Sequence, residues 1–256
     1  MKKIYLSLII LFSLTTSCQS QGELLWEENF DGSKLNESNW NYELGDGCPN
    51  LCGWGNNERQ IYTKESAALK DGNLIITATK DSSTYHSSKI NTKDKFEFQY
   101  GTIEVRAKLA TGKGIWPAIW MLGADIEEVG WPKTGEIDIM EYVGKNPHQI
   151  HTTLHTQDSH GQSKNTNIIT DETIEDGFHI YKADWTSDSI KFYIDSKMVY
   201  DFSPEEKNEN TWPFNKPFYI ILNLAVGGNF GGPEVDDYIF PQEFIVDYVK
   251  VYSIIN

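Results

Sequence analysis

The sequence predicts an all-β protein, a sandwich or jelly roll built from antiparallel sheets. Two observations favour this class: apolar and polar residues alternate over many short segments, and clusters of Gly, Asn, Asp and Pro separate those segments. In addition, no stretch of a dozen residues beyond residue 17 keeps the 3.6-residue period of a helix. Because no internal repeat or long linker divides the chain, we expect one domain over residues 18–256.

The clearest strand is expected at residues 101–109, where Ile103, Val105 and Ala107 alternate with charged residues. Further strands are predicted over residues 74–80, 115–122, 136–143, 149–156, 179–185, 189–195, 217–225 and 244–252. The tripeptide Asp71-Gly72-Asn73 predicts a tight hairpin turn before the strand at residue 74. A short helical turn is expected at residues 204–208.

Composition excludes several classes of protein. The 256 residues carry 22 basic and 37 acidic side chains, a net charge of −15, whereas proteins that bind nucleic acids need clustered Lys and Arg. No apolar run reaches the roughly 18 residues of a membrane span. Aromatic residues make up 13% of the chain, which argues against disorder and suggests surfaces on which flat ligands such as sugars stack.

The first 17 residues predict an export signal, with Lys2 and Lys3 before an apolar stretch at residues 4–14. The segment resembles a bacterial lipoprotein signal, in which Cys18 becomes the lipidated first residue of the mature chain. The alternative is ordinary signal-peptidase cleavage just downstream. We therefore expect export from a bacterial cell, as an outer-membrane lipoprotein or as a periplasmic or extracellular protein. Membrane contact is expected only through the lipid anchor.

Cys48 and Cys52 are the remaining cysteines. An exported protein meets an oxidising compartment, and Pro49-Asn50 favours a turn that brings the two cysteines together, so a disulfide is expected. The alternative is a free pair in a loop. A C-x-x-x-C pair without a second cluster is a weak metal signal.

Three carboxylates lie within six residues: Glu136, Asp138 and Glu141. On a regular strand Glu136 and Asp138 share one face, whereas Glu141 lies on the other. We expect a β-bulge at Ile139-Met140, because one extra residue returns Glu141 to the face of Glu136. The alternative is a charged outer face of a solvated strand, but crowded like charges destabilise a strand that has no use for them.

A row of carboxylates has a known chemical use. Two carboxyl groups about 5–5.5 Å apart suit retaining glycoside hydrolysis, and about 6.5–9.5 Å suits inversion. One group must be ionised to attack, and the other must hold a proton for the leaving oxygen. On a straight strand the outer two would be about 13 Å apart between Cα atoms, so the strand must bend or the side chains must lean together.

At these residues the chain resembles a known family. The string Glu136-Ile137-Asp138-Ile139-Met140-Glu141 is similar to the E-x-D-x-x-E signature of glycoside hydrolase family 16, in the form of its laminarinase-like branch. Matching runs stand at residues 25–28, 114–122, 130–132, 151–155 and 246–252. The resemblance implies a concave jelly roll that cleaves β-1,3-glucan with retention. It makes Glu136 the nucleophile, Glu141 the general acid/base and Asp138 a hydrogen-bonding partner of the nucleophile.

The resemblance also implies a set of substrate-binding residues. They are Trp116, Trp120, Trp131, Asn57, Arg106 and His155. Core packing is the alternative for the tryptophans, most evenly balanced for Trp120. Asn56 is the alternative to Asn57, and a solvated salt bridge is the alternative for Arg106. Asn223 lies in an apolar run, needs a polar partner and is expected to face the groove.

His151 shares strand parity with His155, which suggests a metal site, but no H-E-x-x-H motif is present and substrate binding is favoured for His155. The resemblance further implies a structural calcium ion held by Glu28, the carbonyl of Gly72, and Asp247. Asn29 replaces an acidic residue at the N-terminal part of that site, and an exposed strand residue is the alternative for Asp247. Catalysis is expected to need no cofactor.

We therefore expect a monomeric hydrolase that cuts internal β-1,3-glucosidic bonds of laminarin-type glucans. A relative acting on mixed-linkage β-1,3-1,4-glucan or on an algal galactan is the alternative within the same class. A non-catalytic glucan-binding module on the same sandwich is the alternative from another class, because fold does not fix function.

Overall fold

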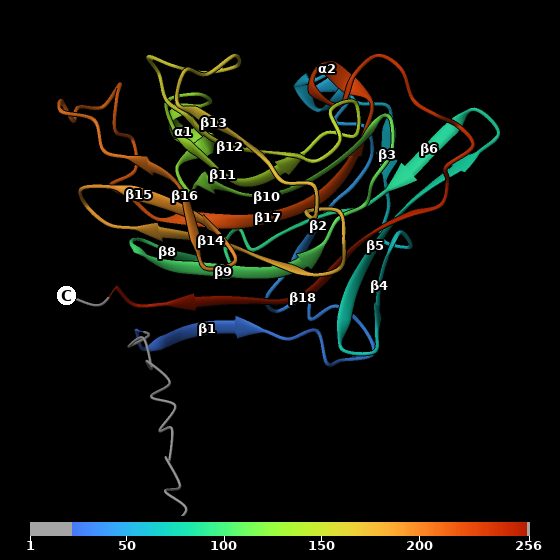
Figure 1. Ribbon diagram of the computed structural model, residues 1–256, viewed down its shortest axis with the longest axis horizontal. Coiled ribbons are helices and arrows are strands. Elements are labelled where there is room, and N and C mark those ends of the chain that lie inside the picture. Colours follow the sequence, from blue (N-terminus) through green and yellow to red (C-terminus); the bar gives the residue numbers. More distant parts are fainter. Residues whose placement is uncertain (1–21, 255–256) are drawn as a thin grey trace, which may run out of the picture.

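The computed structural model describes residues 22–254, so the predicted signal at residues 1–17 and Cys18 lie outside the described residues. Two β-sheets form the fold and stack as layers (Figure 1). In Figure 1, β1 and β18 run along the bottom of the stack, and β10, β11 and β17 form the layer above. The predicted all-β jelly-roll class is confirmed.

The first sheet has ten strands. Its order is β16 (Lys197–Phe202), β15 (Ile190–Ile194), β14 (His179–Trp185), β9 (Gly101–Lys108), β18 (Gln242–Tyr252), β5 (Asn73–Asp81), β6 (Thr84–Ser87) and β3 (Gln60–Tyr62), with β1 (Leu24–Glu28) on β18 and β4 (Ala67–Lys70) on β5. Its pairings are antiparallel except the one between β3 and β6.

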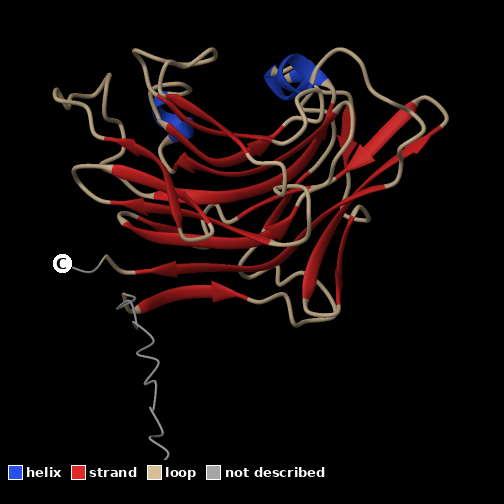
Figure 2. Cartoon of the chain, viewed as in Figure 1, coloured by secondary structure: helices blue, strands red, loops and turns tan. Residues whose placement is uncertain are grey.

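The second sheet has eight strands, all paired antiparallel. Its order is β13 (Thr166–Thr170), β12 (Gln149–His155), β11 (Glu136–Tyr142), β10 (Ile115–Gly123), β17 (Phe218–Val226), β7 (Lys89–Asn91) and β2 (Asn41–Glu43), with β8 (Glu97–Phe98) on β17. Two single-turn helices, α1 (Ile126–Val129) and α2 (Gly228–Gly231), lie at opposite ends above this sheet, and Cys52–Gly55 forms a 3₁₀ turn (Figure 2).

The main core lies between the sheets, and period-2 alternation fills it. In β9, Ile103, Val105 and Ala107 are fully buried in this core, and the residues between them point outward. In β17 the even-numbered residues from Phe218 to Val226 enter the same core. The odd-numbered residues point to the other side of the eight-stranded sheet, which we call the open face. Burial on both sides of β17 explains why its sequence reads as a continuous apolar run.

All nine predicted strands are present, with ends shifted by at most two residues. The missed strands are short or lie toward sheet edges, where few residues alternate. The helical turn expected at residues 204–208 is wrong, because this segment contains only bends. The chain instead turns at residues 209–211, where the backbone N–H of Trp212 donates to the carbonyl of Asn208.

The hairpin turn at Asp71-Gly72 is confirmed. Lys70 and Asn73 are paired across the ends of β4 and β5, so two residues make the turn. Both have positive φ, 53° at Asp71 and 72° at Gly72, which is the backbone of a type I′ turn. The turn fits the right-handed twist of the two strands that it joins.

Among the residues that the structure describes, no helix has the length and apolar character needed to cross a membrane.

Trp40 and Trp185 are fully buried in the main core, and Trp26 packs against it. These three tryptophans are therefore structural.

Candidate active site

The predicted bulge in β11 places the three carboxylates on the open face. Toward β10, Glu136, Asp138 and Glu141 pair with Leu122, Trp120 and Ala118, in even steps. The register shifts between Asp138 and Glu141 on the side of β12 as well. Ile139 is 2% exposed and Met140 is fully buried in the core, so the extra residue is absorbed on the core side. On a regular strand Met140 would face the groove beside Glu136, and its burial in the core excludes that arrangement.

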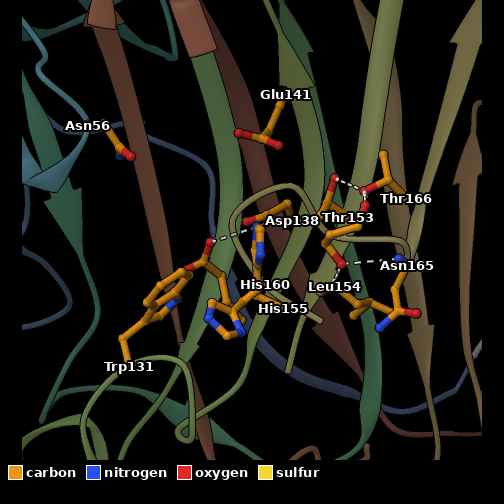
Figure 3. Close-up of polar contacts among 12 residues, drawn as sticks. Asn56, Trp131, Asp138, Glu141, Thr153, Leu154, His155, His160, Asn165 and Thr166 are labelled. Atoms are coloured by element: carbon orange, nitrogen blue, oxygen red, sulfur yellow. Dashed lines mark hydrogen bonds and ion pairs between the residues drawn. The ribbon is translucent and has the colours of Figure 1, made fainter. Parts of the chain in front are cut away.

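Glu136 is held by groups from two other elements. The indole N–H of Trp131, in the loop before β11, donates to Glu136 Oε2 over 3.1 Å. His155 Nε2, from β12, lies 3.5 Å from Glu136 Oε1 and 3.2 Å from Asp138 Oδ2. Burial and the neighbouring Asp138 raise the pKa of Glu136 to about 8, while His155 and Trp131 oppose that rise. Figure 3 shows Trp131, Asp138 and His155 gathered at this end of the row.

Glu141 stands at the other end of the row, apart from this group (Figure 3). The indole N–H of Trp116 donates to its Oε1 over 3.2 Å. Burial raises the pKa of Glu141 well above its usual range, and the charges of Asp138 and Glu136 raise it further. Crowded buried carboxylates cannot all ionise together, so the row retains a proton near neutral pH. The structure thus provides an acid at Glu141, and a second carboxylate, Glu136, whose ionised form is favoured by the hydrogen bond from Trp131 and by the nearby His155.

All three predicted tryptophans reach the open face and none belongs to the main core. Trp116 packs with Val143, Ala225 and Phe230 in a small separate cluster. Trp120 packs in another small cluster on the same face. Trp131 is 47% exposed and presents its ring to solvent while its N–H binds Glu136. Packing in the main core is therefore excluded for these three residues, although Trp116 is buried in its own small cluster.

Asn223 also lies on the open face and has the partners that its burial requires. Its Oδ1 accepts from Trp120 Nε1 over 2.8 Å, and its Nδ2 donates to the hydroxyl of Tyr62 over 3.1 Å. The Tyr62 hydroxyl donates in turn to Glu58 over 3.2 Å. Burial raises the pKa of Glu58. This chain of hydrogen bonds fixes the plane of the Trp120 indole against the sheet.

Lys89 belongs to the same face and was missed from the sequence. Its side chain is buried, and its Nζ lies 4.5 Å from the ring centre of Trp54 and 5.0 Å from that of Trp120. It also forms an ion pair with Glu43 over 2.9 Å. Lys89 and Asn91 flank the core residue Ile90, so alternation along β7 would place both on the open face. However, β7 has only three residues. So short a strand gives no readable period.

A loop carrying the predicted Asn57 borders the open face. The structure joins Cys48 and Cys52 in a disulfide at the start of this loop. Asn57 is exposed and donates to the side chain of Asn229, while the carbonyl of Asn56 accepts from the backbone N–H of Asn229. In Figure 3 Asn56 lies to the left of Glu141, apart from the carboxylates. The choice between the two asparagines as a substrate ligand stays open.

The prediction that Arg106 lies in the cleft is wrong. Arg106 belongs to β9 in the ten-stranded sheet, and its side chain points away from the core on the far side of the molecule from Glu136. There it forms an ion pair with Asp247 and lies over the ring of Phe178. The salt-bridge alternative is therefore correct. Alternation shows which residues share a face of a strand, but it does not show which sheet the strand joins.

The carboxylates of the predicted calcium site already have protein partners. Glu28 accepts hydrogen bonds from the backbone N–H of Phe30 and from the side chains of Asn39 and Trp40. Asp247 is paired with the guanidinium of Arg106, a cation that would compete with a metal ion. These two side chains, as they are arranged, do not fit a calcium site, and we assign no role to calcium.

The comparisons with known proteins agree with this geometry. The model of the family "Glycosyl hydrolases family 16" matches residues 55–238, which span β10, β11 and β12 and therefore all three carboxylates. The chain belongs to glycosyl hydrolase family 16. The matched residues include the whole of β11, the strand that carries the carboxylate row.

Relatives within family 16 include a solved structure, the laminarinase from Flavobacterium sp. UMI-01. It is 59% identical, with a TM-score of 0.89, over 90% of this chain and 100% of that chain. The β-glucanase of Rhodothermus marinus is 38% identical over 98% of this chain and 96% of its own length. Glucan endo-1,3-β-glucosidase A1 of Niallia circulans is 40% identical over 90% of this chain, which spans only 38% of that longer protein.

Proposed function

We propose that this chain is an endo-acting β-1,3-glucanase that hydrolyses laminarin-type glucans with retention of configuration. The observation that carries the proposal is the single row formed by Glu136, Asp138 and Glu141, which the bulge aligns on the open face of β11. The similarity to proteins named laminarinase, β-glucanase and endo-1,3-β-glucosidase supports the choice of substrate.

The proposed mechanism is a double displacement. Glu136 attacks the anomeric carbon, and Glu141 donates its proton to the glycosidic oxygen as the bond to the leaving sugar breaks. Glu141, now ionised, takes a proton from water, whose oxygen displaces Glu136 and releases the product. The raised pKa of Glu141 supports its role as the acid. Burial raises the pKa of Glu136 as well, but the hydrogen bond from Trp131 and the nearby His155 oppose that rise, which supports Glu136 as the nucleophile.

The proposal is tested by the reducing ends released from laminarin, lichenan, agarose and carrageenan, with Glu136→Ser as the control. We expect release from laminarin by the unaltered protein and none by the variant. Release only from lichenan or a galactan would overturn the substrate and keep the mechanism. Binding of laminarin without hydrolysis of any of the four polysaccharides would favour the non-catalytic module. The buried carboxylate row weighs against that module, because sugar binding alone does not need it.

Asp138→Asn is expected to move both limbs of the pH profile of kcat/KM for laminarin to lower pH. The charge of Asp138 raises the pKa of Glu136 and that of Glu141, so its removal lowers both. The activity of the variant and the unaltered protein is measured across a pH series at one ionic strength. An unmoved profile with reduced amplitude would contradict the electrostatic role of Asp138.

Trp131→Ala is expected to raise KM for laminarin about tenfold, because the exposed ring offers a stacking surface for a sugar. The kcat should fall as well, since Glu136 loses a hydrogen-bond donor. Trp131→Phe keeps the ring and removes only the N–H, so it separates the two effects. An unchanged KM in both variants would exclude stacking at this position.

Arg106→Ala is expected to leave laminarin hydrolysis unchanged, because Arg106 lies on the sheet that does not carry the carboxylates. The free energy of unfolding in urea should fall by less than about 1 kcal/mol, as for other exposed ion pairs. Lys89→Ala is the matched comparison, and it should reduce hydrolysis because Lys89 contacts Trp120 on the open face. Loss of activity in Arg106→Ala alone would contradict this assignment.

For the cellular location, we propose export from a bacterial cell and lipidation of Cys18. The order of basic residues, apolar stretch and cysteine in residues 2–18 supports this proposal. Labelling with a radioactive fatty acid tests it, because Cys18→Ala should remove the label and release the protein from membranes. A protein cleaved downstream of Cys18 would carry no label in either form. We also propose that the enzyme is a monomer, which light scattering tests.

A further inference from the structure

Three side chains at the Glu136 end of the carboxylate row are arranged as a metal ion would arrange them. Glu136 and Asp138 each offer an oxygen and His155 offers Nε2, and the three atoms lie within 4.8 Å of one another. Among residues 22–254, this is the only group of three or more His, Cys, Asp or Glu side chains gathered in this way. The three come from neighbouring strands of one rigid sheet.

The spacing matches a small transition-metal ion. Tetrahedral zinc binds His nitrogen and carboxylate oxygen at about 2.0–2.2 Å, which places neighbouring ligand atoms about 3.3–3.5 Å apart. In this structure His155 Nε2 lies 3.2 Å from Asp138 Oδ2 and 3.5 Å from Glu136 Oε1. Two edges of the coordination polyhedron are therefore formed before any ion arrives.

The second indication is an unsatisfied oxygen. Asp138 is only 3% exposed, and its Oδ2 forms no hydrogen bond within the described part of the chain, where its one ion-pair contact is His155 Nε2 at 3.2 Å. A buried carboxylate oxygen without a donor is costly. A divalent cation bound by this oxygen would remove that cost and would reduce the repulsion between Asp138 and Glu136.

We propose that Glu136, Asp138 and His155 bind one zinc-class divalent ion, and that this ion inhibits hydrolysis. The mixed nitrogen and oxygen donors favour zinc, cobalt or copper over calcium and magnesium, which prefer oxygen alone. The fourth position faces solvent on the open face, since Glu136 and His155 are partly exposed there. The bound ion occupies the electron pair with which Glu136 would attack the sugar. The inhibitory part of the inference rests on the proposed function, whereas the binding part does not.

The affinity should be moderate. Histidine ligands in tight sites donate their second ring N–H to an acceptor, and loss of that contact weakens binding 10- to 100-fold. The Nδ1 of His155 has no such partner among the described residues. The ion should therefore be removed readily by EDTA.

Titration with Co²⁺, followed by its visible absorption, tests the binding. We expect one equivalent to give a tetrahedral spectrum that Zn²⁺ abolishes, and we expect Asp138→Asn and His155→Gln to lose it. His160→Gln is the matched control, because His160 packs on Trp131 beside the site but is not a ligand. Loss of the spectrum in the control, displacement by Ca²⁺ as effective as by Zn²⁺, or no spectrum in the unaltered protein would overturn the proposal. Unchanged thermal unfolding of each variant verifies that it is folded.

Inhibition is measured separately. Zn²⁺ should raise the apparent KM for laminarin, and EDTA should restore the original value. Activity that is insensitive to Zn²⁺ at concentrations that displace Co²⁺ would overturn the inhibitory role. If the protein in EDTA hydrolysed no polysaccharide while the Co²⁺ spectrum appeared, the proposed function would fail and the metal site would stand.

Discussion

Replacing Glu136 by glycine is expected to lower kcat for laminarin by a factor on the order of 10⁴ to 10⁶, as loss of the nucleophile does in other hydrolases. The reason is that no other carboxylate takes its place, because Asp138 is 3% exposed and Glu141 lies at the far end of the row. The measurement is single-turnover and steady-state hydrolysis of laminarin, with residual activity checked against contaminating wild-type protein.

Azide gives this variant a sharper test. In Glu136→Gly a small anion fits where the carboxylate stood, and with a dinitrophenyl β-glucoside oligomer it should yield the α-glycosyl azide. The inverted product shows that the missing side chain attacked from that face of the sugar. A β-glycosyl azide, or no rescue in a variant that folds normally, would contradict the role of Glu136 as nucleophile.

Replacing Glu141 by alanine is expected to lower kcat for laminarin by about 10²- to 10⁴-fold, the usual contribution of a general acid. The dinitrophenyl substrate needs no proton on its leaving group, so bond cleavage should be nearly as fast as in the unaltered protein. Azide should then yield the β-glycosyl azide, opposite to the product of Glu136→Gly. Equal losses on laminarin and on the dinitrophenyl substrate would indicate that Glu141 has a merely structural role.

The matched variant Glu141→Gln reports on stability as well. Because burial raises the pKa of Glu141, the folded chain holds a proton that the unfolded chain releases above about pH 4.3. The free energy of unfolding contributed by Glu141 therefore falls as pH rises from that value toward the folded pKa. Glutamine does not titrate, so the Tm advantage of Glu141→Gln should grow from pH 4 to pH 8, by roughly 2–4 °C per kcal/mol.

The sequence predicts the long strands and the carboxylate row because both depend on local patterns. The spacing of Glu136, Asp138 and Glu141 puts Glu141 on the opposite face of the strand unless a bulge is present. The pairing of β11 with β10 and β12 shows the bulge. The pattern of Gly101–Lys108 was equally clear, yet the function assigned to Arg106 was wrong. Local alternation determines the faces of a strand, whereas the sheet that it joins depends on pairing with distant segments.

The parts that could not be predicted are those that depend on long-range contacts. Lys89 lies between Trp54 and Trp120, which come from segments 35 and 31 residues away in the sequence. The His155 contact with Asp138 is different, because β11 and β12 are consecutive and the family resemblance already indicated His155. Side-chain neighbours across adjacent strands can thus be anticipated, whereas neighbours across several strands cannot.

The bulge in β11 also bears on how this gene can change. On a regular strand every second residue shares a face. If the codon of Met140 were lost, Glu136, Asp138 and Glu141 would become the first, third and fifth residues of such a strand, and all three would still face the same way. Deletion of Met140 therefore preserves the orientation of the acids and removes only the interruption of the ladder. Most single-residue deletions in a strand invert every side chain beyond them. Loss of the Met140 codon avoids that inversion.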